Sequence, residues 1–279
     1  MTSPEAPHGA GLTVRAGAAT DVGRVRRHNE DSVLADRTVF VVADGMGGHA
    51  AGEVASRIVT TTLGELADLP VRRREDLVSA LALANRRILE SVAKHPEQTG
   101  MGTTAAGLAV VQAGGSDHWA VFNVGDSRVY RYLDDRLELV TVDHSEVREL
   151  VDAGLITEDE ATRHPLRNVV TRSLGSEPGP KPDVWVFPPR PGERFVICSD
   201  GLSGELPLER IRQLVAEHDD PQQCAEALVA AAVDAGGRDN VSVVVVALDE
   251  QRGGDDADTA PRSAAVAPTA PPGAGTGLR

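Results

Sequence analysis

Residues 39–49 read Val-Phe-Val-Val-Ala-Asp-Gly-Met-Gly-Gly-His, an apolar run that stops at an aspartate followed by glycines. A short continuous apolar run bounded by turn residues predicts a buried strand. A carboxylate at the end of such a strand, beside glycines that let the backbone approach closely, suits a hard cation. This stretch therefore predicts part of a buried sheet with a candidate cation ligand, Asp44, at its edge.

The same pattern recurs once downstream, and a third aspartate precedes another apolar run. Residues 194–201 read Arg-Phe-Val-Ile-Cys-Ser-Asp-Gly, and Asp239 precedes the run Val-Ser-Val-Val-Val-Val at 241–246. An Asp-Gly pair after a strand is also a common turn, so a single occurrence decides little. Three aspartates at strand edges, Asp44, Asp200 and Asp239, are nevertheless expected to converge on one site.

The composition indicates an aliphatic core and an acidic surface. Of the 279 residues 41% are apolar but only 3% are aromatic, so the core must consist mostly of Val, Leu, Ile and Ala. The formal net charge of −14 argues against nucleic acid as a partner, because phosphate contacts require a basic surface. Two cysteines, Cys198 and Cys224, are too few for a disulfide framework or a thiolate zinc site.

The chain divides into three segments. Residues 1–11 are expected to form a flexible N-terminus, residues 12–249 one folded domain, and residues 250–279 a disordered tail rich in Ala, Gly and Pro. The sequence contains no apolar run of about 18 residues, so no membrane span is predicted. The N-terminus lacks the charged region followed by an apolar region that is typical of a signal peptide. We therefore expect a cytoplasmic protein, with a monomer as the default.

Hydrophobic periodicity predicts the order of the elements. Helical spacing is expected over residues 50–66, 76–93, 145–153, 157–162, 208–217 and 221–235. Strands are expected over residues 13–19, 33–43 as a hairpin, 103–112, 118–124, 128–133, 137–140, 184–187, 194–199 and 241–248. Helices grouped between runs of strands favour an α+β fold with antiparallel sheets rather than an alternating parallel fold.

Seven short motifs occur in a fixed order along residues 12–249. They are Arg26 with Asn29-Glu30-Asp31-Ser32, Ala43-Asp44-Gly45-Met46-Gly47-Gly48-His49, Met101-Gly102-Thr103-Thr104, Asn123-Val124-Gly125-Asp126-Ser127-Arg128, Thr171-Arg172-Ser173-Leu174-Gly175, Cys198-Ser199-Asp200-Gly201-Leu202 and Arg238-Asp239-Asn240-Val241-Ser242. Together they resemble the metal-dependent protein phosphatase family (PPM, type 2C), in particular its bacterial branch. The resemblance implies that residues 12–249 form a catalytic domain folded as a four-layer α-β-β-α sandwich, with two antiparallel sheets flanked by helix pairs.

The resemblance also implies an activity. Members of this family hydrolyse phosphoserine and phosphothreonine in proteins by direct attack of a hydroxide that bridges two Mn²⁺ or Mg²⁺ ions. One general acid or base typically accelerates a reaction by only about 10²–10⁴-fold, far less than the hydrolysis of a phosphate ester requires. Two divalent ions can supply more, because they neutralise charge on the phosphate and activate a water molecule. The expected partners are Ser/Thr-phosphorylated proteins, including a bacterial Ser/Thr kinase that the enzyme would oppose.

By resemblance, the metal ligands are assigned residue by residue. Asp44 would bridge both ions, Gly45 would offer its backbone carbonyl to one of them, and Asp200 and Asp239 would complete the protein ligands. Asp126 would help to bind a third, weaker ion together with Asp200. Asp126 has a structural alternative, since it could instead cap the turn in which it lies.

Three further residues are assigned around the ions. Arg26 would bind the substrate phosphate, where a planar guanidinium matches two oxygens. Glu30 and Asp31 would hold metal-bound waters and so orient the metal ligands. The alternatives are that Arg26 belongs to a surface basic cluster with its arginine neighbours, and that Glu30 is a solvated loop acid.

The resemblance does not identify a general acid among the histidines. Eukaryotic relatives carry a histidine, proposed as general acid, where this chain has Met46, so that route is in doubt; His49 and His144 are interpreted as structural. The charged segment 145–172 resembles the family's flap and is expected to influence substrate choice. Two other functions are considered: a non-catalytic PPM-fold protein that binds partners, and an acidic protein that buffers cations.

Overall fold

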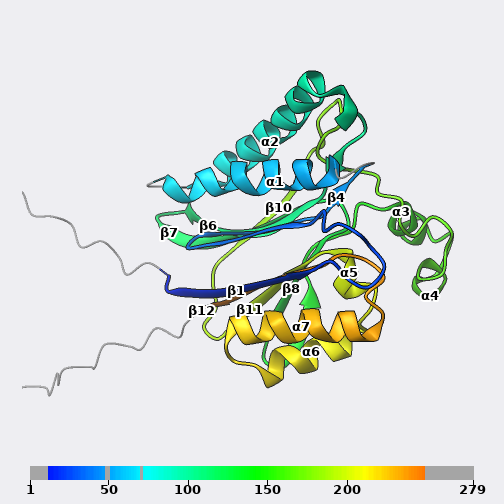
Figure 1. The fold of residues 1–279 in the computed structure, drawn as a ribbon. Helices are drawn as coiled ribbons and strands as arrows, with labels where there is room; N and C mark the ends of the chain where they lie inside the picture. The colour runs from blue at the N-terminus through cyan, green and yellow to red at the C-terminus, as the bar shows by residue number, and fades with distance from the viewer. Residues whose placement is uncertain (1–11, 48–50, 70–71, 249–279) are drawn as a thin grey trace, which may run out of the picture.

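The structure is a computed structural model that describes residues 12–47, 51–69 and 72–248. The predicted N-terminal segment 1–11, the tail 250–279 and His49 lie outside these residues. Two five-stranded antiparallel sheets face each other and helices cover both outer faces (Figure 1). The predicted α+β class and four-layer sandwich are therefore confirmed.

The two large sheets are formed by strands from distant parts of the chain. The first sheet has the order β1 (Val14–Asp21), β12 (Val241–Leu248), β11 (Arg194–Cys198), β8 (Arg128–Leu133) and β9 (Arg136–Leu139). The second sheet has the order β10 (Asp183–Phe187), β7 (Ser116–Val124), β6 (Ala105–Ala113), β3 (Val39–Ala43) and β2 (Ser32–Asp36). A small third sheet pairs β4 (Gly45–Met46) with β5 (Gly102–Thr103).

Helix pairs form the outer layers. The second sheet is covered by α1 (Ala51–Gly64) and α2 (Arg74–Lys94), and the first by α6 (Leu208–Glu217) and α7 (Pro221–Ala235) (Figure 1). Short 3₁₀ turns follow α1 and α2 at Glu65–Asp68 and Pro96–Gln98. No helix in the described ranges is long and apolar enough to cross a membrane.

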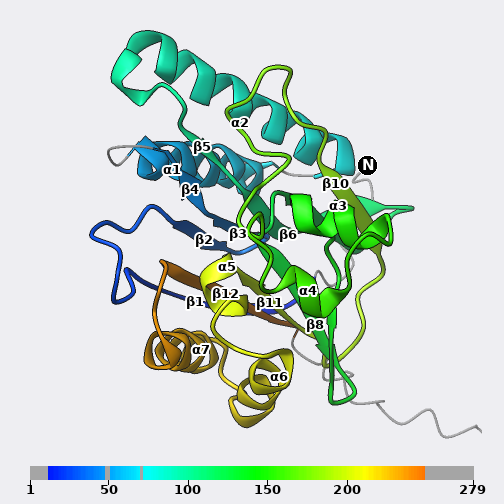
Figure 2. The ribbon, with the colours of Figure 1, turned by 90° about the vertical axis from the view of Figure 1, so that its right-hand side faces the viewer.

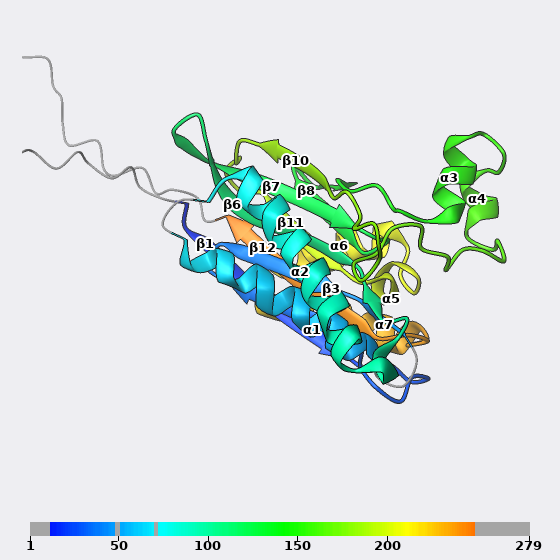
Figure 3. The ribbon, with the colours of Figure 1, turned by 90° about the horizontal axis from the view of Figure 1, so that it is seen from above.

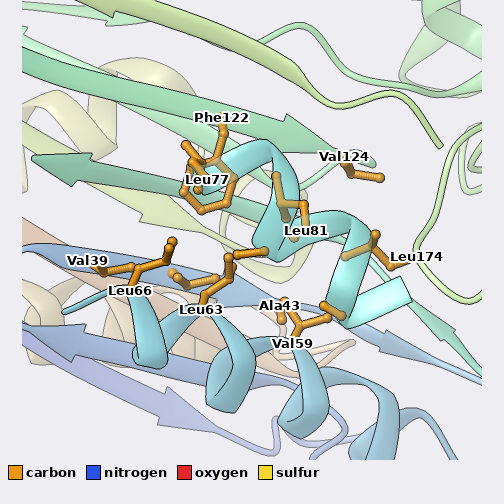
Figure 4. Close-up of a cluster of buried hydrophobic side chains, with 14 of the residues drawn as sticks. Val39, Ala43, Val59, Leu63, Leu66, Leu77, Leu81, Phe122, Val124 and Leu174 are labelled. Atoms are coloured by element: carbon orange, nitrogen blue, oxygen red, sulfur yellow. The ribbon is translucent and has the colours of Figure 1, made fainter. Parts of the chain in front are cut away.

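The central strands are buried on both faces, which explains their continuous apolar runs. In β3, Val39, Val41 and Ala43 pack under α1 and α2, whereas Phe40 and Val42 face the other sheet. Figure 4 shows the first of these layers, where helix side chains meet the sheet. The usual alternation of polar and apolar residues is absent because neither face of these strands meets water.

The register of the first sheet brings two aspartates to one edge. Because β11 and β12 are antiparallel, with Cys198 opposite Val243, the end of β11 lies beside the start of β12. Asp200 follows β11 and Asp239 precedes β12. The two acidic residues, which lie far apart in the sequence, are therefore neighbours at the same end of the sandwich.

The second sheet contributes at this end as well. Ser32, the first residue of β2, pairs with Ala43, the last residue of β3. Asp31, directly before β2, therefore lies near Asp44, directly after β3. The strand β7 ends at the same edge, since β6 is antiparallel to both β3 and β7, and it leads into Asp126. Figure 2 looks toward this end, where β4, α5 (Asp200–Ser203) and the flap helices face the viewer.

The flap projects from this end of the molecule. It contains α3 (Glu146–Asp152) and α4 (Glu158–Ala161), which extend away from both sheets (Figure 3). Both helices were expected from the sequence. The four-residue helix α5 was not, since Asp200 was expected only to follow a strand as a metal ligand.

Candidate metal centre

Asp44 is fixed through its backbone. Its N–H donates to Thr104 Oγ1 at 2.9 Å, and its carbonyl accepts from Thr103 Oγ1 and Thr104 N, both at 2.9 Å. With both backbone groups bonded, the carboxylate is presented at the end of β3 at a defined angle. The two threonines belong to the Met101–Thr104 motif, whose role the sequence alone did not indicate.

Gly45 lies where the backbone comes closest to its neighbours. A Cβ built on this residue would stand 2.3 Å from the Gly52 carbonyl oxygen and 2.4 Å from that of Glu30. Only glycine allows this approach between β4, the start of α1 and the loop before β2. The glycine that the sequence placed beside the candidate ligand is therefore required by packing, whatever its carbonyl binds.

Asp200 and Asp31 are joined across the two sheets by a serine. Ser199, directly before Asp200, donates through Oγ to Asp31 Oδ2 at 2.9 Å, and it also accepts the N–H of Ser242 at 3.0 Å. Asp31 Oδ1 is buried and has no hydrogen-bond partner in the part of the chain that the structure describes. An unpartnered buried carboxylate oxygen is costly unless a cation or water satisfies it.

The carboxylates at this end raise one another's pKa values. Burial, reinforced by the charges of neighbouring aspartates, raises the pKa of Asp31 to about 7 and that of Asp126 to about 7. Burial and the nearby aspartates raise the pKa of Asp44 well above its usual value, and they also raise that of Asp200. Four acids that disfavour each other's charge are stabilised by bound cations, so this donor set fits hard divalent ions.

The described side chains do not yet surround a single point. No group of three acidic, histidine or cysteine side chains within the described ranges has the geometry to hold an ion as it stands. Asp239 faces Arg26 instead, with Arg26 Nη2 donating to Asp239 Oδ2 at 2.7 Å. Asp239 Oδ1 accepts the N–H of Asn240 at 2.8 Å.

The structure brings Arg26 to the acidic residues. Its side chain is 55% exposed and bonds Asp239, and the charges of Asp200 and Asp44 also help to raise its pKa. Arg26 is thus not merely part of a surface cluster, although Arg24 beside it pairs with Asp234 away from this group. An exposed guanidinium at the rim of an acidic centre can reach an incoming anion.

Glu30 is held near the centre through its backbone. Its N–H donates to Asn240 Oδ1 at 2.9 Å and its carbonyl accepts from Ser56 Oγ at 2.6 Å. The described contacts give its carboxylate no partner. The predicted role of Glu30 toward bound water therefore stays a prediction.

Asp126 lies in a turn that other residues hold firmly. Ser127 Oγ and Thr104 Oγ1 are 2.7 Å apart, which ties this turn to the residue that also holds Asp44. Arg128 forms a two-pronged ion pair with Asp143, with Nη2–Oδ2 at 2.6 Å and Nε–Oδ1 at 3.0 Å. No role was predicted for this supporting set from the sequence; the hydroxyl residues Ser127 beside Asp126 and Ser199 beside Asp200 were the available signal.

A comparison with protein families agrees with this arrangement. The model of the family described as protein phosphatase 2C matches residues 24–234, which is most of the described chain. The chain belongs to the protein phosphatase 2C family. The match begins before Arg26 and includes Asp44, Asp126 and Asp200, whereas Asp239 lies just beyond it.

Several bacterial members of the protein phosphatase 2C family are similar in sequence. The serine/threonine protein phosphatase PstP of Mycobacterium tuberculosis is 40% identical over 239 residues, which are 84% of this chain and 45% of that protein. The protein phosphatase PhpP of Streptococcus pneumoniae is 35% identical, over 83% of this chain and 96% of that protein. The chain thus spans less than half the length of the first relative and nearly all of the second.

The fold is also that of a solved member. A structure of the catalytic domain of PstP in complex with two manganese ions superimposes with a TM-score of 0.78 at 36% identity. The superposition covers 86% of this chain and 100% of that one. The sequence-based assignment to the bacterial branch of the family is therefore confirmed.

Proposed function

We propose that this protein is a metal-dependent phosphatase that hydrolyses phosphoserine and phosphothreonine in proteins. The observation that carries the proposal is the set of buried aspartates brought to one end of the sandwich, whose pKa values are raised by burial and by one another. Membership of the family supports it, as do relatives named Ser/Thr protein phosphatases. The manganese in the related PstP structure supports a metal requirement.

Two Mn²⁺ or Mg²⁺ ions would be held by Asp44, the Gly45 carbonyl, Asp200 and Asp239, and Asp126 would join Asp200 at a third, weaker ion. Oxygen donors without thiolates favour these metals over zinc. Two such metal ions, when bound, would neutralise charge on the phosphate. They would also lower the pKa of a water molecule so that it can act as a nucleophile, in its deprotonated form, near neutral pH.

The remaining residues would handle substrate and water. Arg26 would release Asp239 to bind the phosphate oxygens through its planar fork and hold the phosphoester at the acidic centre. Asp31, with one oxygen fixed by Ser199 and the other unpartnered, would orient water at the ions, and Glu30 would assist. Met46, in β4, has no acidic proton that it could donate to the leaving oxygen.

The proposed substrates are phosphoproteins of the bacterial cytoplasm, including a Ser/Thr kinase whose action this enzyme would reverse. Phosphorylated proteins are the substrates that the names of the relatives imply. Release of phosphate from a kinase phosphorylated on threonine would test this part separately from the chemistry.

The deciding experiment measures phosphate released from a phosphothreonine peptide with and without Mn²⁺. The wild type is expected to require Mn²⁺, and Asp200→Asn is expected to lose activity. Asp219→Asn is the matched control, because Asp219 is 99% exposed and remote from the centre. No turnover with any divalent cation, together with retained metal binding, would instead favour a non-catalytic protein that binds partners.

A further inference from the structure

His144 is the only histidine buried within residues 12–47, 51–69 and 72–248, with 4% of its surface exposed. It stands between two regions, since it precedes the flap in the sequence and contacts the turn that carries Asp126. The proposed chemistry uses it neither as a ligand nor as an acid. Its contacts suggest another task.

Both ring nitrogens of His144 are bonded. Nδ1 lies 3.1 Å from the backbone N of Gly125, and Nε2 lies 3.1 Å from Asp183 Oδ2. A backbone N–H can only donate, so Nδ1 must be the acceptor and the ring proton resides on Nε2, where it donates to Asp183. The backbone N–H of His144 also donates to the Gly125 carbonyl at 2.9 Å, so Gly125 is held at both its N–H and its C=O.

The residue before His144 holds the other end of the same turn. Asp143 bonds Arg128 through two oxygens, while His144 bonds Gly125. Gly125 has φ +111° and its Cβ position is 2.6 Å from Thr104, so this turn has little freedom to find another conformation. Asp126 lies between the two anchored ends.

The other side of His144 faces the base of the flap. Its carbonyl accepts the N–H of Thr171 at 2.8 Å. Arg172 Nη1 lies 3.4 Å from Asp183 Oδ1 and 3.2 Å from His144 Nε2; because a protonated Nε2 cannot accept a hydrogen bond, the partner of Arg172 is the carboxylate that also accepts the histidine proton. Asp183 begins β10, an edge strand of the second sheet. His144 therefore joins the Asp126 turn, both ends of the flap and the sheet.

We propose that His144 is a positioning residue that sets the direction of the Asp126 carboxylate and makes it depend on the base of the flap. The inference rests on the proposed function, because Asp126 matters to the reaction only as a ligand of the weaker ion. The Nδ1 bond to Gly125 orients the turn, and the Nε2 bond to Asp183 keeps the ring in place for that task. Loss of the first bond loosens Asp126 without disturbing Asp44 or the strands.

Two substitutions separate the two ring contacts. In His144→Asn the amide can reach the position of Nδ1 and retain the bond to Gly125, whereas in His144→Gln the longer side chain reaches that of Nε2 and retains the bond to Asp183. His118→Gln is the control, because His118 lies in β7 and its ring, among the described residues, bonds only the Ser116 carbonyl. Asp183→Ala is the fourth variant, at a site whose side chain is 36% exposed and therefore tolerant.

The first readout is Mn²⁺ binding to the full chain, followed by electron paramagnetic resonance of free Mn²⁺. We expect His144→Gln to raise the dissociation constant of the weaker ion about tenfold, the lower end of effects seen for residues that orient metal ligands, and to leave the tight ions within about twofold. His144→Asn and His118→Gln should bind all ions as the wild type does. A role in general stability alone would weaken both Asn and Gln variants alike and would not separate the weak ion from the tight ones.

The second readout is amide hydrogen exchange at Gly125 and Thr171 in EDTA, which does not depend on metal. The Gly125 amide should exchange about tenfold faster in His144→Gln than in the wild type, whereas His144→Asn should protect it. If the histidine variants fail to fold, Asp183→Ala replaces them and should accelerate exchange at both amides. Unchanged Gly125 exchange in His144→Gln, or in Asp183→Ala where that variant is used, overturns the inference. A wild type without a weaker Mn²⁺ site refutes the third-ion part of the proposed function, and with it the role of His144 toward that ion.

Discussion

The acidic centre and the flap lie at the same end of the molecule but are built in opposite ways. Asp44 and Asp239 are attached to β3 and β12, which are completely buried, and Asp200 follows β11, in which every residue but Arg194 is buried. Helices α3 and α4 of the flap contain no buried residue. Leu155, between them, is 70% exposed.

The difference indicates how the molecule separates chemistry from selection. Buried strands have the highest local stability, so side chains at their ends keep their positions to within the tolerance that catalysis demands. Segments with few buried apolar contacts open readily and adapt to a partner. We therefore expect changes at the centre to alter turnover, and changes in the flap to alter the choice of phosphoprotein.

The largest effect should come from Asp44→Asn. Loss of the carboxylate that would bridge both ions should lower kcat/KM for a phosphothreonine peptide by at least about 10³-fold, as expected when transition-state charge stabilisation is removed. In EDTA the same change should raise the melting temperature, because it removes one of the mutually repelling acids. Asp152→Asn, in the exposed α3, is the control; equal loss of activity in both variants would contradict the division proposed between the two regions.

Arg26→Lys should have the next largest effect. A lysine keeps the charge but cannot bind two phosphate oxygens in a planar fork, so kcat/KM should fall about 10²-fold while Mn²⁺ binding is retained. Arg24→Lys is a matched control, since Arg24 is similarly exposed and pairs with Asp234 at 2.7 Å. Steady-state kinetics with a phosphopeptide measures both variants. Wild-type kinetics in Arg26→Lys would argue that Arg26 does not bind the phosphate.

A smaller effect, on selection rather than turnover, is expected when the flap is shortened. The Glu146 N–H donates to the Val169 carbonyl at 2.9 Å, so these ends are adjacent and a short glycine linker can replace residues 147–168. The preference of the enzyme among phosphopeptides should shrink about tenfold, a change of about 1.4 kcal/mol, while hydrolysis of a small aryl phosphate stays within about threefold. An equal loss on both kinds of substrate would place the flap in the chemistry itself.

Much of the fold could be predicted because its signals are local. The complete burial of β3 follows from a continuous Val-Phe-Val-Val-Ala run, and α2 follows from its apolar stripe of leucines and Ile88. The turn at Arg37 and Thr38 closes the predicted hairpin between β2 and β3. The three aspartates Asp44, Asp200 and Asp239 could be proposed together only because each ends or begins such a run.

The rest depends on contacts between distant residues, which no local pattern encodes. The serine bridge from Ser199 to Asp31 joins residues 168 positions apart, and the bond between Arg26 and Asp239 joins residues 213 apart. The two hydrogen bonds between His144 and Gly125 likewise depend on how the flap returns to the sheet. Such contacts are fixed by strand register, and a single sequence specifies register only through the whole core.

The last expected effect concerns the pH dependence of stability rather than turnover, and it again separates the two regions. Folding raises the pKa of Asp31 to about 7, above the value of about 3.9 for an exposed aspartate, so between these limits the folded protein binds more protons than the unfolded chain. Stability in EDTA should therefore fall as pH rises from about 4.5 to 7. Asp31→Asn should reduce that fall by roughly 3 kcal/mol, which is about 6–12 °C in melting temperature for a domain of this size. Glu158→Gln, which removes a flap acid that is 73% exposed, should leave the slope unchanged. Thermal unfolding at several pH values measures both variants. If the pH dependence of the melting temperature changed in Glu158→Gln rather than in Asp31→Asn, the pH-sensitive repulsion would not reside in the acidic centre.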